Sequence, residues 1–326
     1  MAAYQLTSIE KRLSDPDAGV RRVAVIDLPY SDEVEDVGPL LTLALADESA
    51  LVRLEAAKAL EGFEEIEVLQ ALVPLLRDND AKVRAAVAYT LAELKQPASA
   101  APILPYLADA DPEVKAAALH AVRALRVVEA FEPAMLALAH DIAAVRKEAV
   151  GVLGYLKNSQ AISALTQIAA NDPEPEVRRV AVGALGFATE SADISVHPAL
   201  SRAIHDSAWQ VREEAATTFA KTRSALGVAD LIRAMDDEYW QVRVKAARSL
   251  GKLKAKSSVH VLSLASTHEM SNLRKESVIA LGELGDVRAI PALERALRDS
   301  DPDVRKLAKL ALTSIQMVTT SMELAP

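Results

Sequence analysis

Side chains that could carry out catalysis or bind a metal are few in this chain of 326 residues. It has no Cys, which excludes thiolate catalysis, disulfides, and Cys-ligated zinc or iron–sulfur sites. Its one His-Glu pair is His268-Glu269, whereas a metal site needs about three converging ligands. No Gly-rich phosphate loop and no nucleophile elbow occurs. We therefore expect no catalytic residue, no metal site and no cofactor.

Two aromatic phrases are the more promising binding feature. The stretch "DSAWQVREEAA" begins at Asp206 and "DEYWQVRVKAA" begins at Asp237, and they hold the chain's only two Trp residues. Trp209 and Trp240 should stand side by side with Tyr239 next to them, as exposed anchors of the kind that dominates protein interfaces. The same rings could instead pack over a neighbouring turn. The sequence leaves both interpretations open.

The Val-Arg dipeptide inside these phrases recurs along the chain at spacings of 31 to 34 residues. Its ten copies are Val20-Arg21, Val52-Arg53, Val83-Arg84, Val114-Lys115, Val145-Arg146, Val177-Arg178, Val211-Arg212, Val242-Arg243, Leu273-Arg274 and Val304-Arg305. Counting the Val (or Leu273) as position 0, position +4 is small in every copy but one (Val87), and position +8 is Leu, Val or Phe. This spacing is one face of an α-helix.

Position −5 is Asp in eight of the ten copies, which predicts a capped turn before this helix. In two copies Asp111 and Asp301 should cap the helix, with Pro112 and Pro302 at its first position. A second apolar helix precedes each turn, and prolines predict that it is short or kinked: Pro39, Pro74, Pro102, Pro133, Pro198 and Pro291. We name the first helix of each copy A and the second B.

Ten such hairpins predict an all-α, right-handed α-solenoid over residues 1–317, with A helices on the convex side and B helices on the concave side. Residues 318–326 should form a frayed tail. The repeat, D-x-x-x-x-V-R-x-x-A-A-x-A-L-G, resembles the HEAT-like repeat of the phycobilisome-lyase type. It is carried by "DESALVRLEAAKALE", "DPEPEVRRVAVGALG" and "DEYWQVRVKAARSLG".

The resemblance implies this fold, and it implies functions as different as bilin lyase subunits, di-iron deoxyhypusine hydroxylases and scaffolds. The hydroxylases carry His-Glu at positions +2 and +3. Those positions here hold other pairs, such as Lys147-Glu148, Glu213-Glu214 and Lys275-Glu276. His140 and His268 stand instead at position −5, where we expect them to act as weaker turn caps.

Charge is distributed unevenly. Residues 1–200 hold 30 acidic and 18 basic residues, whereas residues 201–326 hold 16 and 19. Acidic clusters lie at "SDEVED" and "EGFEEIE", and a basic one, "RSLGKLKAK", contains Arg248, Lys252, Lys254 and Lys256. These clusters are either solvated loop faces or a docking surface for a partner of opposite polarity. The Arg at position +1 should form a structural ladder with Asp side chains or carbonyl groups of the same or the next copy.

Position +6 of helix B should face the concave groove. Its row reads Ile26, Lys58, Tyr89, His120, Gly151, Gly183, Thr217, Arg248, Ile279 and Leu310. Tyr89 and His120 beside two glycines predict either a shallow pocket or a groove that merely tolerates small residues.

We therefore predict a non-enzymatic scaffold or accessory factor that binds another protein. The residues expected to contact it are Lys58, Tyr89, His120, Trp209, Tyr239, Trp240 and Arg248. The alternative is a bilin-lyase-like or cofactor-maturation subunit, whose partner would be a protein carrying a bilin or another cofactor. The net charge of −9 disfavours nucleic acid. The absence of a signal-like start and of a segment of roughly 18 apolar residues predicts an unprocessed cytoplasmic protein.

Overall fold

The B helices begin where the repeat register places them. The computed structural model describes residues 8–188 and 193–323, and within these ranges helices and turns alternate without a strand. Every B helix starts two residues before position 0. These helices are α2 Ala18–Asp27, α4 Ala50–Ala59, α6 Ala81–Ala92, α7 Pro112–Arg123, α9 Ala143–Leu156, α11 Pro175–Ala184, α13 Trp209–Thr222, α15 Trp240–Lys252, α17 Ser271–Leu284 and α19 Pro302–Glu323.

The side chain at position −5 organises the turn before each B helix. In eight copies an Asp carboxylate accepts the backbone N–H two residues further on, at 2.8–2.9 Å. Where His replaces Asp, Nδ1 of His140 accepts from Ile142 at 3.1 Å and Nδ1 of His268 accepts from Met270 at 3.0 Å. The two histidines are therefore turn caps, as predicted. Asp111 also caps α7 by accepting from the Glu113 N–H, with Pro112 at the first helical position.

The A helices are α1 Ser8–Leu13, α3 Gly38–Ala44, α5 Ile66–Leu72, α8 Phe131–Ala137, α10 Ile162–Asn171, α12 Asp193–Ala203, α14 Val228–Ala234, α16 Val259–Ala265 and α18 Ile290–Ala296. Most A helices are short, with six or seven residues, and α3 and α18 are short as their prolines predict. The exceptions are α10 with ten residues and α12 with eleven, the latter although Pro198 lies inside it. In the fourth copy, two 3₁₀ segments, Pro97–Ala100 and Leu104–Ala108, take the place of the A helix. Pro74 lies in another 3₁₀ segment, Val73–Arg77, because a proline inside a helix removes a backbone hydrogen bond.

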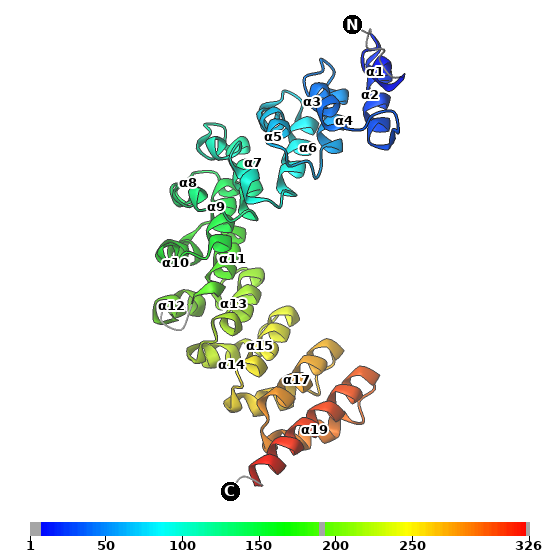
Figure 1. Cartoon of the computed structure of the whole chain (residues 1–326). Coiled ribbons are helices and arrows are strands. Elements are labelled where there is room, and N and C mark those ends of the chain that lie inside the picture. The colour runs from blue at the N-terminus through cyan, green and yellow to red at the C-terminus, as the bar shows by residue number, and fades with distance from the viewer. Residues whose placement is uncertain (1–7, 189–192, 324–326) are drawn as a thin grey trace. The chain divides into compact units, whose positions relative to one another are not determined.

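The chain forms two compact units, Met1–Leu156 and Lys157–Pro326. Within each unit a B helix packs beside the next B helix, as α13, α15, α17 and α19 do in turn (Figure 1). A helices pack on the B helix of their own copy, as α10 does on α11 and α16 on α17, whereas in the third copy the 3₁₀ segment Val73–Arg77 packs on α6. Positions 0, +4 and +8 make the core: Val242, Ala246 and Leu250 are fully buried. Each such Val or Leu contributes about 1.5–3 kcal/mol when buried.

Arginines at position +1 tie successive copies together, as predicted. The Arg53 guanidinium donates to both carboxylate oxygens of Asp78, in the next copy, at 2.7 and 2.8 Å, and to the carbonyl of Asp47 at 2.8 Å. These hydrogen bonds hold the pKa of Asp78 below its usual range. The same pairing joins Arg21 to Asp47, Arg178 to Asp206, Arg212 to Asp237 and Arg274 to Asp299.

The ladder is broken at one histidine in the second unit. The register places His268 opposite Arg243, and His268 has no carboxylate to offer. Nε of Arg243 is buried, and no group in the described part of the chain forms a hydrogen bond with it. At the end of the chain, α19 continues to Glu323, so residues 318–323 of the expected tail are helical, and 324–326 lie outside the described residues.

Candidate functional site

The charged residues predicted to face a partner are engaged in ion pairs on the B helices. Nζ of Lys58 lies 3.3 Å from a Glu55 carboxylate oxygen one turn earlier. His120 and Arg248 instead reach the Glu at position +3 of the next copy: His120 Nδ1 lies 2.9 Å from Glu148, and Arg248 Nε lies 3.0 Å from Glu276. These pairs stitch adjacent B helices. Tyr89, an uncharged member of this predicted set on the B helices, is 60% exposed.

Glu148 is the most embedded of these acceptors. Burial raises the pKa of its carboxyl group. The hydrogen bond to His120 and the charge of the nearby Lys147 together lower that pKa by more, so it lies below its usual range. Arg123 also lies 3.3 Å from this carboxylate. Glu148 is therefore a buried anion that pairs with Arg123 and Lys147 and lies within hydrogen-bonding distance of His120.

The two glycines of the +6 row do not open onto free space. A Cβ at Gly151 would lie 2.9 Å from Cδ of Arg123, and a Cβ at Gly183 would lie 2.9 Å from Oε1 of Glu214. In each case a long side chain of a neighbouring B helix occupies the room that the glycine leaves. The space beside these glycines is thus filled by the side chains of Arg123 and Glu214, and it is not an open pocket.

Trp209 and Trp240 are the first residues of α13 and α15. The ring of Trp209 stacks on Tyr239 with centroids 5.5 Å apart and planes at 13°. The Arg212 guanidinium lies over the same Tyr239 ring at 5.5 Å. Among the described residues the ring partner of Trp209 is therefore Tyr239 and not Trp240. Tyr239 remains 39% exposed, and both indoles are half-buried.

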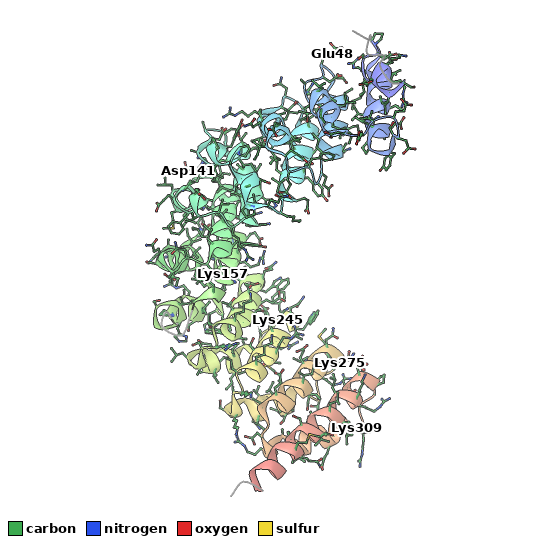
Figure 2. The ribbon with its side chains drawn as sticks, viewed as in Figure 1. Glu48, Asp141, Lys157, Lys245, Lys275 and Lys309 are labelled. Atoms are coloured by element: carbon green, nitrogen blue, oxygen red, sulfur yellow. The ribbon has the colours of Figure 1, made fainter. Side chains whose placement is uncertain are left out.

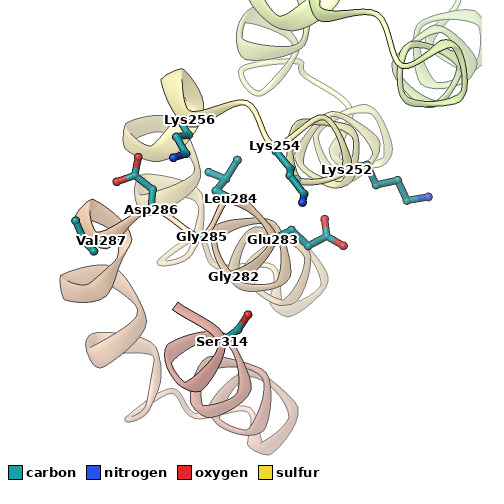
Figure 3. Close-up of a pocket in the computed structure, with 11 residues that line it drawn as sticks. Lys252, Lys254, Lys256, Gly282, Glu283, Leu284, Gly285, Asp286, Val287 and Ser314 are labelled. Atoms are coloured by element: carbon teal, nitrogen blue, oxygen red, sulfur yellow. The ribbon is translucent and has the colours of Figure 1, made fainter. Parts of the chain in front are cut away.

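A cleft lined by three lysines lies in the second unit, at the C-terminal ends of α15 and α17 (Figure 3). Its volume is about 930 Å³. Its lining residues are Gly251, Lys252, Lys254, Lys256, Gly282, Glu283, Leu284, Gly285, Asp286, Val287 and Ser314, the last from α19. We call it the lysine cleft. Three consecutive copies contribute to it.

The lysine side chains are exposed and available. The described residues provide no carboxylate within 4.0 Å of Nζ of Lys252, Lys254 or Lys256. Asp286, by contrast, is paired with Arg288 at 2.7 Å, and that hydrogen bond lowers its pKa to about 2. The acidic group on this wall is therefore already neutralised by a neighbour. The cations that line the cleft are not.

Glu283 is the second acidic group in the cleft. Its carboxylate lies against Gly251, where any larger residue would collide with it. Burial raises the pKa of Glu283, and the attraction of Lys252 offsets only part of that rise. The lining thus carries three lysines against one unpaired carboxylate. The arrangement favours an anionic group over a cationic one.

The backbone of Lys254 is unusual. Its φ is +50°, in the left-handed region that glycine adopts most easily, and Gly285 has φ +61° at the same position of the next copy. Arg126, Lys157 and Arg223 adopt the same conformation at that position of their copies. A basic side chain is thus held at the ends of several B helices although glycine would be less strained. Cations are also favourable beside the carbonyl groups at a helix C-terminus.

The first unit is acidic and the second unit, which contains the lysine cleft, is nearly neutral in net charge. Residues 1–156 carry 25 acidic and 15 basic side chains, and residues 157–326 carry 21 and 22. Figure 2 labels examples of each: Glu48 and Asp141 in the first unit, and Lys157, Lys245 and Lys309 in the second. No helix in the described ranges is long and apolar enough to cross a membrane. Within those ranges no three His, Asp or Glu side chains group as metal ligands.

Part of the lysine cleft could be predicted from the sequence, and the rest could not. Lys252, Lys254 and Lys256 belong to the basic cluster identified above, whereas its fourth member, Arg248, is turned to Glu276. Glu283 and Gly285 come from the next copy and had no signal of their own. The repeat register could have indicated that these residues lie near the lysines, because Lys254 and Gly285 both occupy position +12 of their copies.

Comparison with known proteins gives the family of the repeat. The profile of the HEAT repeats matches residues 6–92, 35–123, 69–141, 131–220, 162–239 and 228–313. The Escherichia coli protein YibA is 20% identical, with a TM-score of 0.54 over 96% of this chain and 99% of its own. An engineered protein is also 20% identical, with a TM-score of 0.53 over 95% of this chain and 99% of its own.

A larger protein aligns with a higher score. Kap95p, in a structure that describes its binding to RanGDP, is 12% identical with a TM-score of 0.64 over 95% of this chain. The aligned part is 51% of Kap95p, so this chain spans about half its length. At these identities the likeness concerns the fold alone. No curated protein matches the chain in sequence.

Proposed function

Because this chain belongs to the HEAT repeat family, an all-α solenoid fold, we propose that it is a non-enzymatic scaffold or accessory factor that binds another protein. We propose further that it binds an acidic segment of that protein in the lysine cleft. The observation that carries the proposal is the set of three lysines without carboxylate partners around one cleft of about 930 Å³. Stacked helical repeats offer extended surfaces of the kind used for protein binding.

Electrostatics supports an acidic partner. Lysines at the rim of an interface speed association and fix its register, since they attract carboxylates over several ångströms. The aromatic edge formed by Trp209, Tyr239 and Trp240 lies in the same unit and offers apolar contact area. Tyr and Trp are enriched among the residues that dominate binding energy.

Affinity purification tests this proposal. The full chain is used as bait beside the variant Lys252→Ser/Lys254→Ser/Lys256→Ser. A control variant, Lys157→Ser/Lys306→Ser/Lys309→Ser, removes the same charge from exposed lysines of the same unit outside the lysine cleft. We expect one stoichiometric protein, identified by mass spectrometry, that the wild type and the control capture and the cleft variant loses. Equal capture by all three baits would contradict the proposal.

A bilin-lyase-like or cofactor-maturation subunit is the second candidate, supported by the same cations, because an anionic cofactor would also be attracted to them. It would carry the repeat of the phycobilisome-lyase type. Copurification of an absorbance band beyond the protein's own would favour it over the scaffold. Retention on DNA or RNA at low salt would overturn both, since phosphate binding is strongest there.

A further inference from the structure

We propose that the first unit holds a separate docking site, between α3 and α5, for a protein segment that carries a large apolar side chain flanked by Lys or Arg. The site is a cleft of about 530 Å³. Pro39, Thr42 and Leu43 of α3 line one side, Glu67 and Val68 of α5 line the other, and Phe63 and Glu65 close the end. Pockets of roughly 300–1,000 Å³ hold small ligands and anchoring side chains.

The floor of this cleft is apolar and firmly packed. Gly38 is buried, and a Cβ there would lie 3.4 Å from the Phe63 ring, so the ring packs directly on the start of α3. Leu43 is 72% exposed although it is a large aliphatic residue. It also borders a second hollow, of about 290 Å³, on the other side of α3. An apolar side chain that entered either hollow would cover Leu43 and gain the free energy of burying it.

The rim is acidic without a compensating cation. Asp36, Glu65 and Glu67 line the cleft, and no Lys or Arg does. The chain has no Lys or Arg between Arg22 and Arg53, nor between Lys58 and Arg77. The acidic clusters of these two loops are Asp32, Glu33, Glu35 and Asp36, and Glu61, Glu64, Glu65 and Glu67.

Three of these carboxylates are used inside the fold, and one of them, Asp36, accepts the Gly38 N–H at 3.1 Å. Glu64 accepts from the Gln96 N–H and the Ser99 hydroxyl, and Glu33 accepts from the Ile9 N–H. The carboxylates of Glu65 and Glu67 have no ion-pair or hydrogen-bond partner among the described residues. Like charges crowded around an apolar floor repel one another and destabilise the free protein unless a cation covers them. A segment with an apolar anchor and basic flanks matches both features.

This site differs in chemistry from the lysine cleft, since one selects basic and the other acidic segments. Whether a partner carries both segments does not affect the test of either. If the test of one site fails, the proposal for the other site is not contradicted.

The probe is a phage-displayed library of random peptides of about 12 residues, panned on the immobilised full chain. The key variant is Glu65→Lys/Glu67→Lys, and the matched control is Glu129→Lys/Glu132→Lys, which makes the same change of charge at exposed positions of the same unit. Leu43→Ser removes the apolar floor at an exposed position where folding is not at risk. Melting curves verify that all variants remain folded.

We expect enriched peptides to combine an aliphatic or aromatic residue with Lys or Arg on both sides. Fluorescence polarisation should show that Glu65→Lys/Glu67→Lys weakens such a peptide about tenfold or more, Leu43→Ser several-fold, and the control less than about twofold. No enrichment, or peptides that bind the charge-reversed chain equally well, would overturn the proposal. So would concentration-dependent self-association that the key variant abolishes, because the occupant would then be a second copy of the chain.

Discussion

Replacing His268 with Asp should repair the broken rung of the arginine ladder and stabilise the protein. His268 Nδ1 accepts the Met270 N–H at 3.0 Å, a role that an Asp carboxylate fills in eight other copies. One ladder step later, Arg274 donates to both oxygens of Asp299 at 2.7 and 2.8 Å. The change therefore keeps the turn cap and offers Arg243 the partner that its buried Nε lacks.

The size of the gain follows from the group that is left unsatisfied. A buried donor without a partner costs about 1–3 kcal/mol, and the ladder side chains are only partly removed from water. We expect His268→Asp to raise the free energy of unfolding by about 1–2 kcal/mol at pH 7. In a unit of this size that corresponds to an increase in Tm of roughly 2–8 °C. The gain should be complete above about pH 4 and be lost as pH falls through the folded-state pKa of the introduced carboxylate, which the guanidinium should lower as it does at Asp299.

Thermal and urea unfolding, followed by circular dichroism, measure this difference. His268→Asn is the matched control, because it retains an acceptor for the Met270 N–H but adds no charge. His140→Asp is a second control: it faces Lys115, whose single ammonium cannot bind two oxygens as a guanidinium does, and should gain less. If His268→Asp is no more stable than His268→Asn, the ladder does not bind the copies together as we describe.

Four further predictions concern the ladder and the lysine cleft. Arg53→Ala should cost about 2–4 kcal/mol in urea unfolding, because it strands the buried Asp78, whereas Arg305→Ala, which loses only carbonyl contacts, should cost less than about 1 kcal/mol. The lowered pKa values of Asp47, Asp78 and Asp299 mean that their contribution is complete above about pH 4 and is lost as pH falls through their folded-state pKa values; Arg53→Ala should flatten this acid loss, and a parallel slope would count against it. Lys254→Gly should relieve the left-handed backbone and raise stability by about 0.5 kcal/mol while it weakens capture of the acidic partner; stability and binding that fall together would refute this account. Glu283→Gln should tighten binding of that partner about two- to tenfold in calorimetric titration, since it removes the unpaired carboxylate of the lysine cleft, and weaker binding would argue for a cationic ligand.

Local signals made the fold predictable. In each copy the residue at position −5 predicts where helix B starts, and positions 0, +4 and +8 predict its buried face. All ten B helices begin where this register places them. The prolines correctly predicted that α3 and α18 are short, whereas α12 has 11 residues although Pro198 lies inside it. These features depend on contacts within about ten residues, so no knowledge of distant packing was needed.

Side-chain partners were harder to predict, because they depend on how one copy faces the next. Arg248 was expected to face a partner, yet position +6 of one copy lies beside position +3 of the following copy, where Glu276 binds it. Trp209 was expected to stand beside Trp240. It stacks instead on Tyr239, the residue that directly precedes α15.

The most direct test of the proposed function is zero-length carbodiimide cross-linking of the chain to its captured partner, which joins carboxylates to lysine amines that are in contact. We predict cross-linked peptides in which partner Asp or Glu residues are joined to Lys252, Lys254 and Lys256. Cross-links confined to other exposed lysines, such as Lys157, Lys306 and Lys309, would contradict the assignment of the lysine cleft as the site that binds the partner.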